Sequence, residues 1–562
     1  MINPILNFCF LFLTIPLSAQ PTLVKNIQPG LGSSVFLSLE KSAVAGNYLY
    51  FTANDDVHGF ELWKSDGTAA GTVMVRDIFP GKSQDGPQQL YAAYKNQLYF
   101  TARDTTHETE LWRTDDAEGA VLLTDACPGT CDGAQYFQPL PMAVYQDKLY
   151  FRSLTPGTGQ ELWVTEGDSA GAMLVKDIDP GGTDSNPYLL TVFQDKLYFV
   201  CDSANWGREL WVTDGTEAGT RPVKNINPTL SFSVGDSGID GLVIGPDALY
   251  FWAKSDNATG KELWKSDGTE PGTVIVKDIN PGSGNGASGK PLNNSAWLGS
   301  DLIFVANDGA TGEELWITDG TEAGTMLLAD INPGASGSGI QIFGAVNGSV
   351  LFKANDGSTG YELWITDGTS AGTVLLKDIL PGTFGSFRSF DSDFIVFQNK
   401  LFFTAEDGVT GRELWISDGT PDGTMLFADV ASGSTESIPS HYRLIGNTLF
   451  FFAQTNATGR ELWKYDLSSV GTKAPESSLP FELNPTVSNT GIFNLVLDRH
   501  LIQSGSYRLE VHDLTGQLRT SRTLAGVSQA IDLSALPSGA YFVRVLEMQS
   551  NRNGIKKVFI LK

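Results

Sequence analysis

Two histidines and one tryptophan are the side chains best placed to do chemistry, because each replaces the usual residue of a recurring loop. Five residues before a repeated Trp, most copies have Thr, as at Thr311 and Thr359, but three copies have His58, His107 and Trp206. Two histidines could form a metal site or an acid–base pair, and a loop Trp can stack on a sugar ring. A third ligand is missing, and equivalent loops on neighbouring units lie too far apart for one metal. We therefore expect loop histidines without a metal, and treat all three residues as candidates for a ligand-facing loop.

Cysteine usage predicts one local disulfide. Cys127 and Cys131 flank a Pro-Gly-Thr turn, and an exported chain would allow them to pair. Cys201 stands where other copies have Ala, which predicts a buried free thiol.

No catalytic motif is recognisable. The sequence has no Ser-His-Asp arrangement, phosphate-binding loop or metal-spaced cluster, so we expect no enzyme activity, no catalytic residues and no cofactor. Calcium is the alternative left open by Asp/Asn/Gly-rich loops such as Asn307-Asp308-Gly309, although none has the spaced carboxylates of a calcium loop.

The charge balance excludes two classes of partner. The 562 residues include 38 Lys+Arg and 64 Asp+Glu, a formal net charge of −26. Nucleic acid and anionic lipid would both be repelled. Sixty aromatic residues (12 Trp, 16 Tyr, 32 Phe) supply a large core, and 61 Gly with 26 Pro indicate frequent turns.

The N-terminus reads as an export signal. Residues 8–17 form an apolar run too short to span a bilayer, followed by small residues. We predict a signal peptide over residues 1–19, cleaved after Ala19 or Gln20, and no transmembrane segment elsewhere.

A repeat fills residues 20–472. Glu-Leu-Trp recurs nine times, at a period near 50 residues, with its Trp at 63, 112, 163, 211, 264, 316, 364, 415 and 463. Each unit holds four short β-branched or aromatic runs, for example 340–346, 350–354, 362–366 and 374–378. Four strands per repeat predict an all-β fold, a large β-propeller of about nine blades.

The ends of the repeat predict how the ring closes. A fourth-strand pattern follows each of the first eight repeated Trp residues but not Trp463, and the missing copy lies at residues 23–30. An N-terminal strand can therefore complete the last blade and remove the free edges.

The signature Glu314-Leu315-Trp316-Ile317-Thr318-Asp319-Gly320-Thr321 resembles the ELWxxDGT repeat family of exported bacterial proteins, whose activity is largely undefined. Asp-Gly-Thr is intact in six units and altered at residues 115–117, 166–168 and 466–468. In every unit the Trp is most simply packing between blades, and Asp-Gly-Thr is most simply a turn.

A second domain follows a linker at residues 473–481. Residues 482–562 alternate like strands and resemble the C-terminal sorting domain of type IX secretion cargo, on features including Asn484-Pro485, residues 511–516 and residues 536–542. The resemblance implies a small β-sandwich, the type IX secretion machinery as partner, and a location outside the cell or on its outer surface. An Ig-like adhesion module is the alternative.

Length variation between units lies in the connection from one blade to the next, on the face that also carries the loop between second and third strands. Function is expected there. The sequence thus predicts a secreted or cell-surface binding or adhesion module for a glycan or protein ligand. An extracellular polysaccharide-active enzyme and a structural surface protein are the alternatives.

Overall fold

The computed structural model describes residues 20–36, 41–82, 86–128, 141–167, 171–228, 236–256, 258–287, 289, 291–388 and 393–469, and most residues of the strands between 481 and 560. The chain divides into two compact units, Met1–Asp466 and Leu467–Lys562. The described residues begin at Gln20. The predicted signal peptide, residues 1–19 including Ala19, therefore lies outside the described residues.

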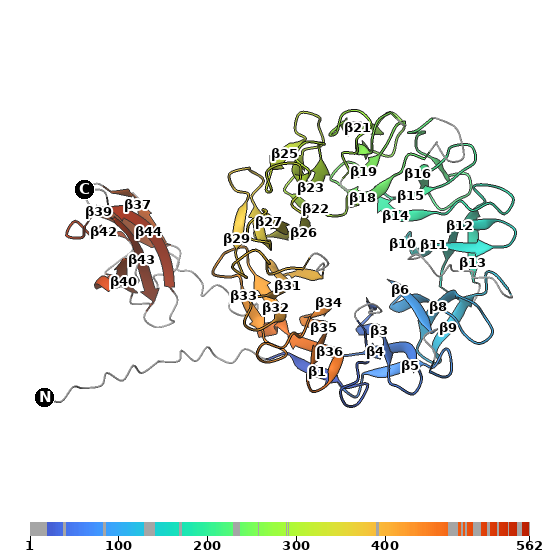
Figure 1. Cartoon of the computed structure of the whole chain (residues 1–562), viewed down its shortest axis with the longest axis horizontal. Helices are drawn as coiled ribbons and strands as arrows, with labels where there is room; N and C mark the ends of the chain where they lie inside the picture. The colour runs from blue at the N-terminus through green and yellow to red at the C-terminus, as the bar shows by residue number, and fades with distance from the viewer. Residues whose placement is uncertain are drawn as a thin grey trace. The chain divides into compact units, whose positions relative to one another are not determined.

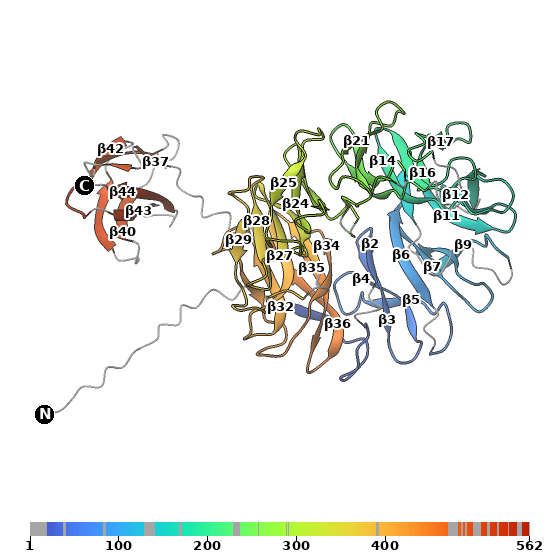
Figure 2. The same ribbon diagram turned by 45° about the horizontal axis from the view of Figure 1, so that its top comes forward.

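The first unit is a ring of nine four-stranded antiparallel sheets, numbered here as blades 1 to 9 along the chain (Figure 1). In each blade the first strand lies toward the centre of the ring and the fourth at its outside. Figure 2 shows this arrangement for β2 and β6 (inside) and β5 and β9 (outside). The nine-bladed all-β prediction is confirmed.

The blades have the following strands. Blades 1 to 3 are β2 (Ser42–Ala45), β3 (Tyr48–Asn54), β4 (Phe60–Ser65), β5 (Val73–Arg76); β6 (Pro87–Tyr94), β7 (Gln97–Ala102), β8 (Glu110–Asp115), β9 (Gly119–Thr124); and β10 (Met142–Tyr145), β11 (Lys148–Thr155), β12 (Gly159–Thr165), β13 (Ala172–Lys176). Blades 4 to 6 are β14 (Tyr188–Phe193), β15 (Lys196–Cys201), β16 (Glu209–Thr213), β17 (Arg221–Pro222); β18 (Asp240–Ile244), β19 (Leu249–Ala253), β20 (Glu262–Ser266), β21 (Val274–Lys277); and β22 (Ser295–Leu298), β23 (Asp301–Asn307), β24 (Glu313–Thr318), β25 (Met326–Ala329). Blades 7 to 9 are β26 (Gln341–Val346), β27 (Ser349–Asn355), β28 (Tyr361–Thr366), β29 (Val374–Lys377); β30 (Phe394–Phe397), β31 (Lys400–Glu406), β32 (Arg412–Ser417), β33 (Met425–Ala428); and β34 (Ser440–Ile445), β35 (Thr448–Thr455), β36 (Gly459–Asp466) with β1 (Thr22–Lys25).

The N-terminal strand closes the ring. β1 pairs antiparallel with β36, with Thr22 opposite Lys464 and Leu23 opposite Trp463 (Figure 1). Blade 9 therefore takes its outer strand from the opposite end of the repeat region, as the displaced fourth-strand pattern predicts.

The repeated Trp packs between blades. Trp63 lies in one buried cluster with Phe51 of its own blade and with Phe452 and Val24 of blade 9. Leu62, one residue earlier, belongs to the cluster shared with blade 2. Because side chains alternate along the third strand, its Leu packs against the next blade and its Trp against the preceding one. The same pair of residues therefore forms the interface between neighbouring blades around the ring.

The Asp-Gly-Thr segment forms a hydrogen-bonded turn after the third strand. Asp319 Oδ1 accepts bonds from the Thr321 backbone N–H (2.8 Å) and hydroxyl (2.7 Å). The Thr321 hydroxyl in turn accepts a bond from Gly324 N–H at 3.0 Å. Gly320 has a φ of 84°, which favours glycine. The turn is stabilised locally without an added ligand.

The Glu of Glu-Leu-Trp ties each blade to the connection that follows it. Glu362 accepts bonds from the backbone N–H groups of Ile379 (2.8 Å) and Leu380 (3.2 Å), and from Ser386 N–H (2.8 Å) and hydroxyl (2.7 Å). Burial raises the pKa of this carboxyl from 4.5 to about 7. The same cause raises the pKa of Glu61, Glu161, Glu262, Glu413 and Glu461 to about 7, and that of Glu209 to about 8.

The second unit contains two sheets. One comprises β37 (Phe481–Asn484), β39 (Ile492–Leu497) and β42 (Ser528–Asp532); the other comprises β38 (Val487–Ser488), β40 (Tyr507–Asp513), β41 (Leu518–Leu524), β43 (Gly539–Glu547) and β44 (Asn553–Ile560). A single 3-10 turn, η1 (Leu467–Ser469), follows β36. No helix among the described residues is long and apolar enough to cross a membrane.

Candidate functional site

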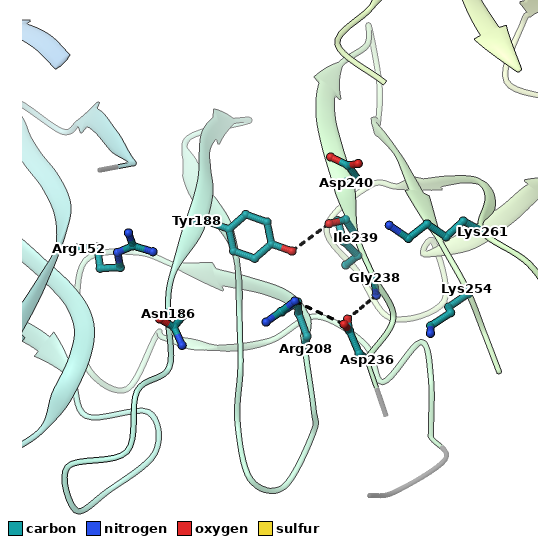
Figure 3. Close-up of a pocket in the computed structure, with 10 residues that line it drawn as sticks. All are labelled: Arg152, Asn186, Tyr188, Arg208, Asp236, Gly238, Ile239, Asp240, Lys254 and Lys261. Atoms are coloured by element: carbon teal, nitrogen blue, oxygen red, sulfur yellow. Dashed lines mark hydrogen bonds and ion pairs between the residues drawn. The ribbon is translucent and has the colours of Figure 1, made fainter. Parts of the chain in front are cut away.

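A cavity of about 630 Å³ lies on the ring face that carries the loops between second and third strands and the connections between blades. Ligand pockets of small molecules have this size. Its lining residues come from blades 3, 4 and 5 and are Arg152, Asn186, Tyr188, Arg208, Asp236, Gly238, Ile239, Asp240, Lys254 and Lys261 (Figure 3).

Blade 3 contributes a buried cation. Arg152 lies in β11 between two core-facing neighbours and is only 5% exposed. Phe151 packs toward blade 2, so the alternating strand turns Arg152 toward blade 4. Figure 3 shows its guanidinium entering the cavity on the side opposite the two lysines.

Blade 4 supplies an aromatic wall held by a charged pair. Arg208 donates to both Asp202 oxygens (2.8 and 3.0 Å) and to Asp236 Oδ2 (3.4 Å). Its guanidinium lies 5.8 Å from the centre of the Tyr188 ring. The Tyr188 hydroxyl donates to the Ile239 carbonyl at 2.9 Å, which joins blade 4 to blade 5 (Figure 3). Burial raises the pKa of Tyr188, so this phenol stays neutral.

Blade 5 supplies two cations, Lys254 and Lys261, that form no ion pair with any described residue. Lys254 follows β19 and Lys261 precedes β20, and both are half-buried. Throughout the described part of the chain, neither ammonium group has a hydrogen-bond or ion-pair partner. Two half-buried ammonium groups beside a cavity attract a negatively charged ligand group, most strongly where water is partly excluded.

Carboxylates complete the site on blade 5. Asp236 Oδ1 accepts a bond from Gly238 N–H at 2.6 Å, and its other oxygen faces Arg208. Asp240 opens β18 and lines the cavity. The cavity thus combines excess positive charge with oxygen acceptors, which suits a ligand carrying both an anionic group and hydrogen-bond donors.

The two predicted loop histidines each bond to an Asp within their own loop. His58 Nδ1 lies 2.7 Å from Asp55 Oδ2, and His107 Nδ1 lies 3.0 Å from Asp104 Oδ1. The hydrogen bond to Asp55 raises the pKa of His58. In other units Thr makes the same contact, as Thr359 does with Asp356 at 3.0 Å. The described residues hold no group of three or more His, Cys, Asp or Glu arranged to bind a metal.

Trp206 lies two residues before Arg208, in the loop between β15 and β16, and is 37% exposed.

Cys127 is buried and disulfide-bonded, whereas Cys131, its predicted partner, lies outside the described residues. Cys201 is a free, buried thiol. Asp308 of the loop weighed for calcium accepts bonds from Ala310 and Thr311 N–H at 2.8 and 2.7 Å.

Residues 484–561 match the secretion system C-terminal sorting domain family. The protein is an exported type IX cargo. It is therefore secreted or held at the outer surface, and its C-terminal unit addresses the secretion machinery.

The sequence of the whole chain has no match among proteins of curated function. Among solved structures it is similar to PorZ, described as a surface component of the type IX secretion system of Porphyromonas gingivalis (13% identity, TM-score 0.25, 93% of this chain and 75% of that one). It is also similar to the extracellular domain of a putative hybrid two component system, BT4673 of B. thetaiotaomicron (10% identity, TM-score 0.26, 93% of this chain and 86% of that one), and to a puromycin hydrolase (13%, TM-score 0.33, 69% and 61%). Sequence identities and TM-scores this low give no ground for assigning the function of any of these proteins to this chain.

Proposed function

We propose that this exported propeller is a binding or adhesion module, a member of the ELWxxDGT repeat family, whose ligand enters the cavity between blades 3, 4 and 5. One observation carries the proposal: the cavity opens on the face where the units differ most in sequence and length, and its lining breaks the repeat. No other unit has lysine at the repeat positions of Lys254 and Lys261, although Arg103 stands at the first position and Arg208, Arg412 and Arg460 stand at the second. A feature needed for folding would recur in every blade, whereas basic residues at both positions occur together only in blade 5.

The proposal assigns recognition rather than catalysis to the site. Arg208 and the Gly238 N–H both donate to Asp236 and so fix the orientation of its carboxylate, which suits binding of hydroxyl or amino groups. Incubation with extracellular polysaccharides should therefore leave them uncleaved by mass spectrometry.

The test is binding of the recombinant full chain to a glycan array, with calcium and with chelator. Selective binding that Trp206→Ala weakens at least fivefold is expected, because Trp206 belongs to the same loop as the cavity-lining Arg208. Tyr48→Ala is the matched control, since Tyr48 is similarly exposed (38%) but lies in the hairpin on the opposite face. Loss of binding in chelator would make calcium part of the site. A silent array together with self-assembly of the ring in solution would instead favour a structural surface role.

A further inference from the structure

The charges around the cavity are arranged in two parts. Lys254 and Lys261 project from blade 5 toward the cavity, and Figure 3 shows both ammonium ends near Gly238. Gly238, with a φ of 58°, carries no side chain, and a Cβ placed there would meet the Lys261 side chain at 2.7 Å. The glycine therefore leaves space that Lys261 needs to reach the cavity.

The second part consists of acceptors. Asp240 lies above Ile239 in Figure 3, and no described residue bonds to its carboxylate. Asn186 lines the blade 4 side and can both donate and accept. A phosphate monoester, which is a dianion, would be drawn to the lysines but repelled by Asp236 and Asp240 more strongly than a monoanion. A single carboxylate surrounded by hydroxyl groups fits both parts.

The surroundings favour a sugar ring as the carrier of that carboxylate. Trp206 is 37% exposed and belongs to the same loop as Arg208, although it is not one of the residues that line the cavity, and aromatic faces stack on the C–H faces of sugar rings. The protein acts outside the cell, where acidic polysaccharides are accessible. The chain's net charge of −26 repels anions from most of the surface. An anionic ligand is therefore directed to the cavity, where the local charge is positive.

We infer that the cavity binds a carboxylate-bearing sugar, a uronic acid residue, with Lys254 and Lys261 on its carboxylate and Asp240 and Asn186 on its hydroxyl groups. This inference rests on the proposed binding function and names its ligand class. Arg152, buried at the opposite wall, adds positive charge to the same space.

The experiment is calorimetric titration of the full chain with galacturonic acid, tetragalacturonate and neutral galactotetraose. Galacturonate binding is expected to exceed neutral binding at least tenfold and to weaken as salt is raised. Lys254→Ala/Lys261→Ala should lower the affinity at least tenfold, and Lys254→Arg/Lys261→Arg should keep most of it. Lys196→Ala/Lys400→Ala is the matched control. Both lysines lie in hairpins on the opposite face of the ring, and the two substitutions remove the same amount of positive charge. Circular dichroism and thermal unfolding check that each variant folds.

The outcomes separate this inference from the function on which it rests. Binding by the monosaccharide as well as the tetramer supports a free sugar acid as ligand, and binding by the tetramer alone supports a polysaccharide chain. Equal affinity for acidic and neutral sugars, or binding that survives the double alanine variant, overturns the uronate site while the binding module stands. Binding of a dipeptide in place of any sugar does the same. If the acidic sugars and the whole glycan array are both silent, both proposals fail.

Discussion

The Lys25 ammonium group donates a hydrogen bond of 2.7 Å to the carbonyl of Thr72, across the boundary where the ring closes. The same side chain lies 5.7 Å from the centre of the Trp63 ring. Lys25 belongs to the outer strand of blade 9, and both of its contacts belong to blade 1. Equivalent contacts join other neighbours, as when Lys377 of blade 7 donates to Thr424 of blade 8 at 2.6 Å.

Lys25→Met should weaken ring closure, because the Thr72 carbonyl loses a charged donor while the apolar stem is kept. We expect a loss of about 1–2 kcal/mol in the free energy of unfolding, measured with denaturant. Limited proteolysis should also cut the β1 region faster. Lys377→Met is the control: a similar loss without faster N-terminal cutting is expected, and equal cutting in both variants would contradict a special role at closure.

Glu362→Gln should destabilise the propeller by about 2–4 kcal/mol. The variant turns an NH₂ group toward N–H and O–H donors that now meet carboxylate oxygens. Chemical denaturation measures the effect. Glu322→Gln makes the same chemical change at an exposed turn position and should cost less than about 0.5 kcal/mol.

The buried glutamates predict a stability that falls as the pH rises. Burial raises the folded-state pKa of Glu362 from 4.5 to about 7, so between these values the folded chain keeps a proton that the unfolded chain has released. The thermal midpoint should therefore be higher near pH 5 than near pH 8. Repeating the series at high salt screens surface repulsion but not the buried groups, so most of the slope should persist. A midpoint that rises toward pH 8 would refute this account.

His58→Thr should leave stability within about 0.5 kcal/mol of the original. Thr359 shows that Thr makes the same bond to its loop Asp, so the substitution restores the common form of the turn. Asp55→Ala should cost about 1 kcal/mol or more, because it removes the acceptor for Val57 and His58 N–H. If His58→Thr instead abolishes ligand binding with the fold intact, the histidine is functional.

Deleting residues 484–561 should prevent delivery to the outside of the cell, since these residues match the sorting domain. In a host with type IX secretion, fractionation and immunoblotting should find the truncated protein inside the outer membrane and the full chain beyond it. A reporter placed between residues 1–20, which hold the predicted signal peptide, and residues 482–562 is the complementary control and should be exported.

The repeat made most of the fold predictable. Nine Glu-Leu-Trp strings at one period determine the blades, and the displaced fourth strand at residues 23–30 predicts which ends meet. The hydrogen bonds that the repeated Glu accepts from the connection after its blade are not predicted from the sequence, where packing is assigned to the neighbouring Trp and no role to the Glu. A usable signal existed: Ser185, Ser338 and Ser386 each stand 24 residues after such a Glu.

The cavity could not be found in the same way. Arg152, Tyr188 and Lys254 belong to three different units, so the departure of any one of them from the repeat does not indicate a cavity, and only the ring brings them together. Of the predicted loop residues, Trp206 belongs to the loop that supplies Arg208 but does not itself line the cavity. His58 and His107 lie in blades 1 and 2 and do not line it. The Asp three residues before each histidine was the signal that these side chains complete turns.

The closing strand also dictates an order of events. Ser34 donates its hydroxyl to Glu461 at 2.6 Å, a contact between residues 427 positions apart in the chain. β1 leaves the ribosome before any blade exists, yet its partner strand is among the last of the ring to be made. β1 therefore stays unpaired until some 440 further residues have been synthesised. Contacts between residues so far apart along the chain slow folding. Once β36 is made and until β1 pairs with it, blade 9 is a three-stranded sheet with an open edge, so the newly made chain is most prone to mispairing just before its ring is complete.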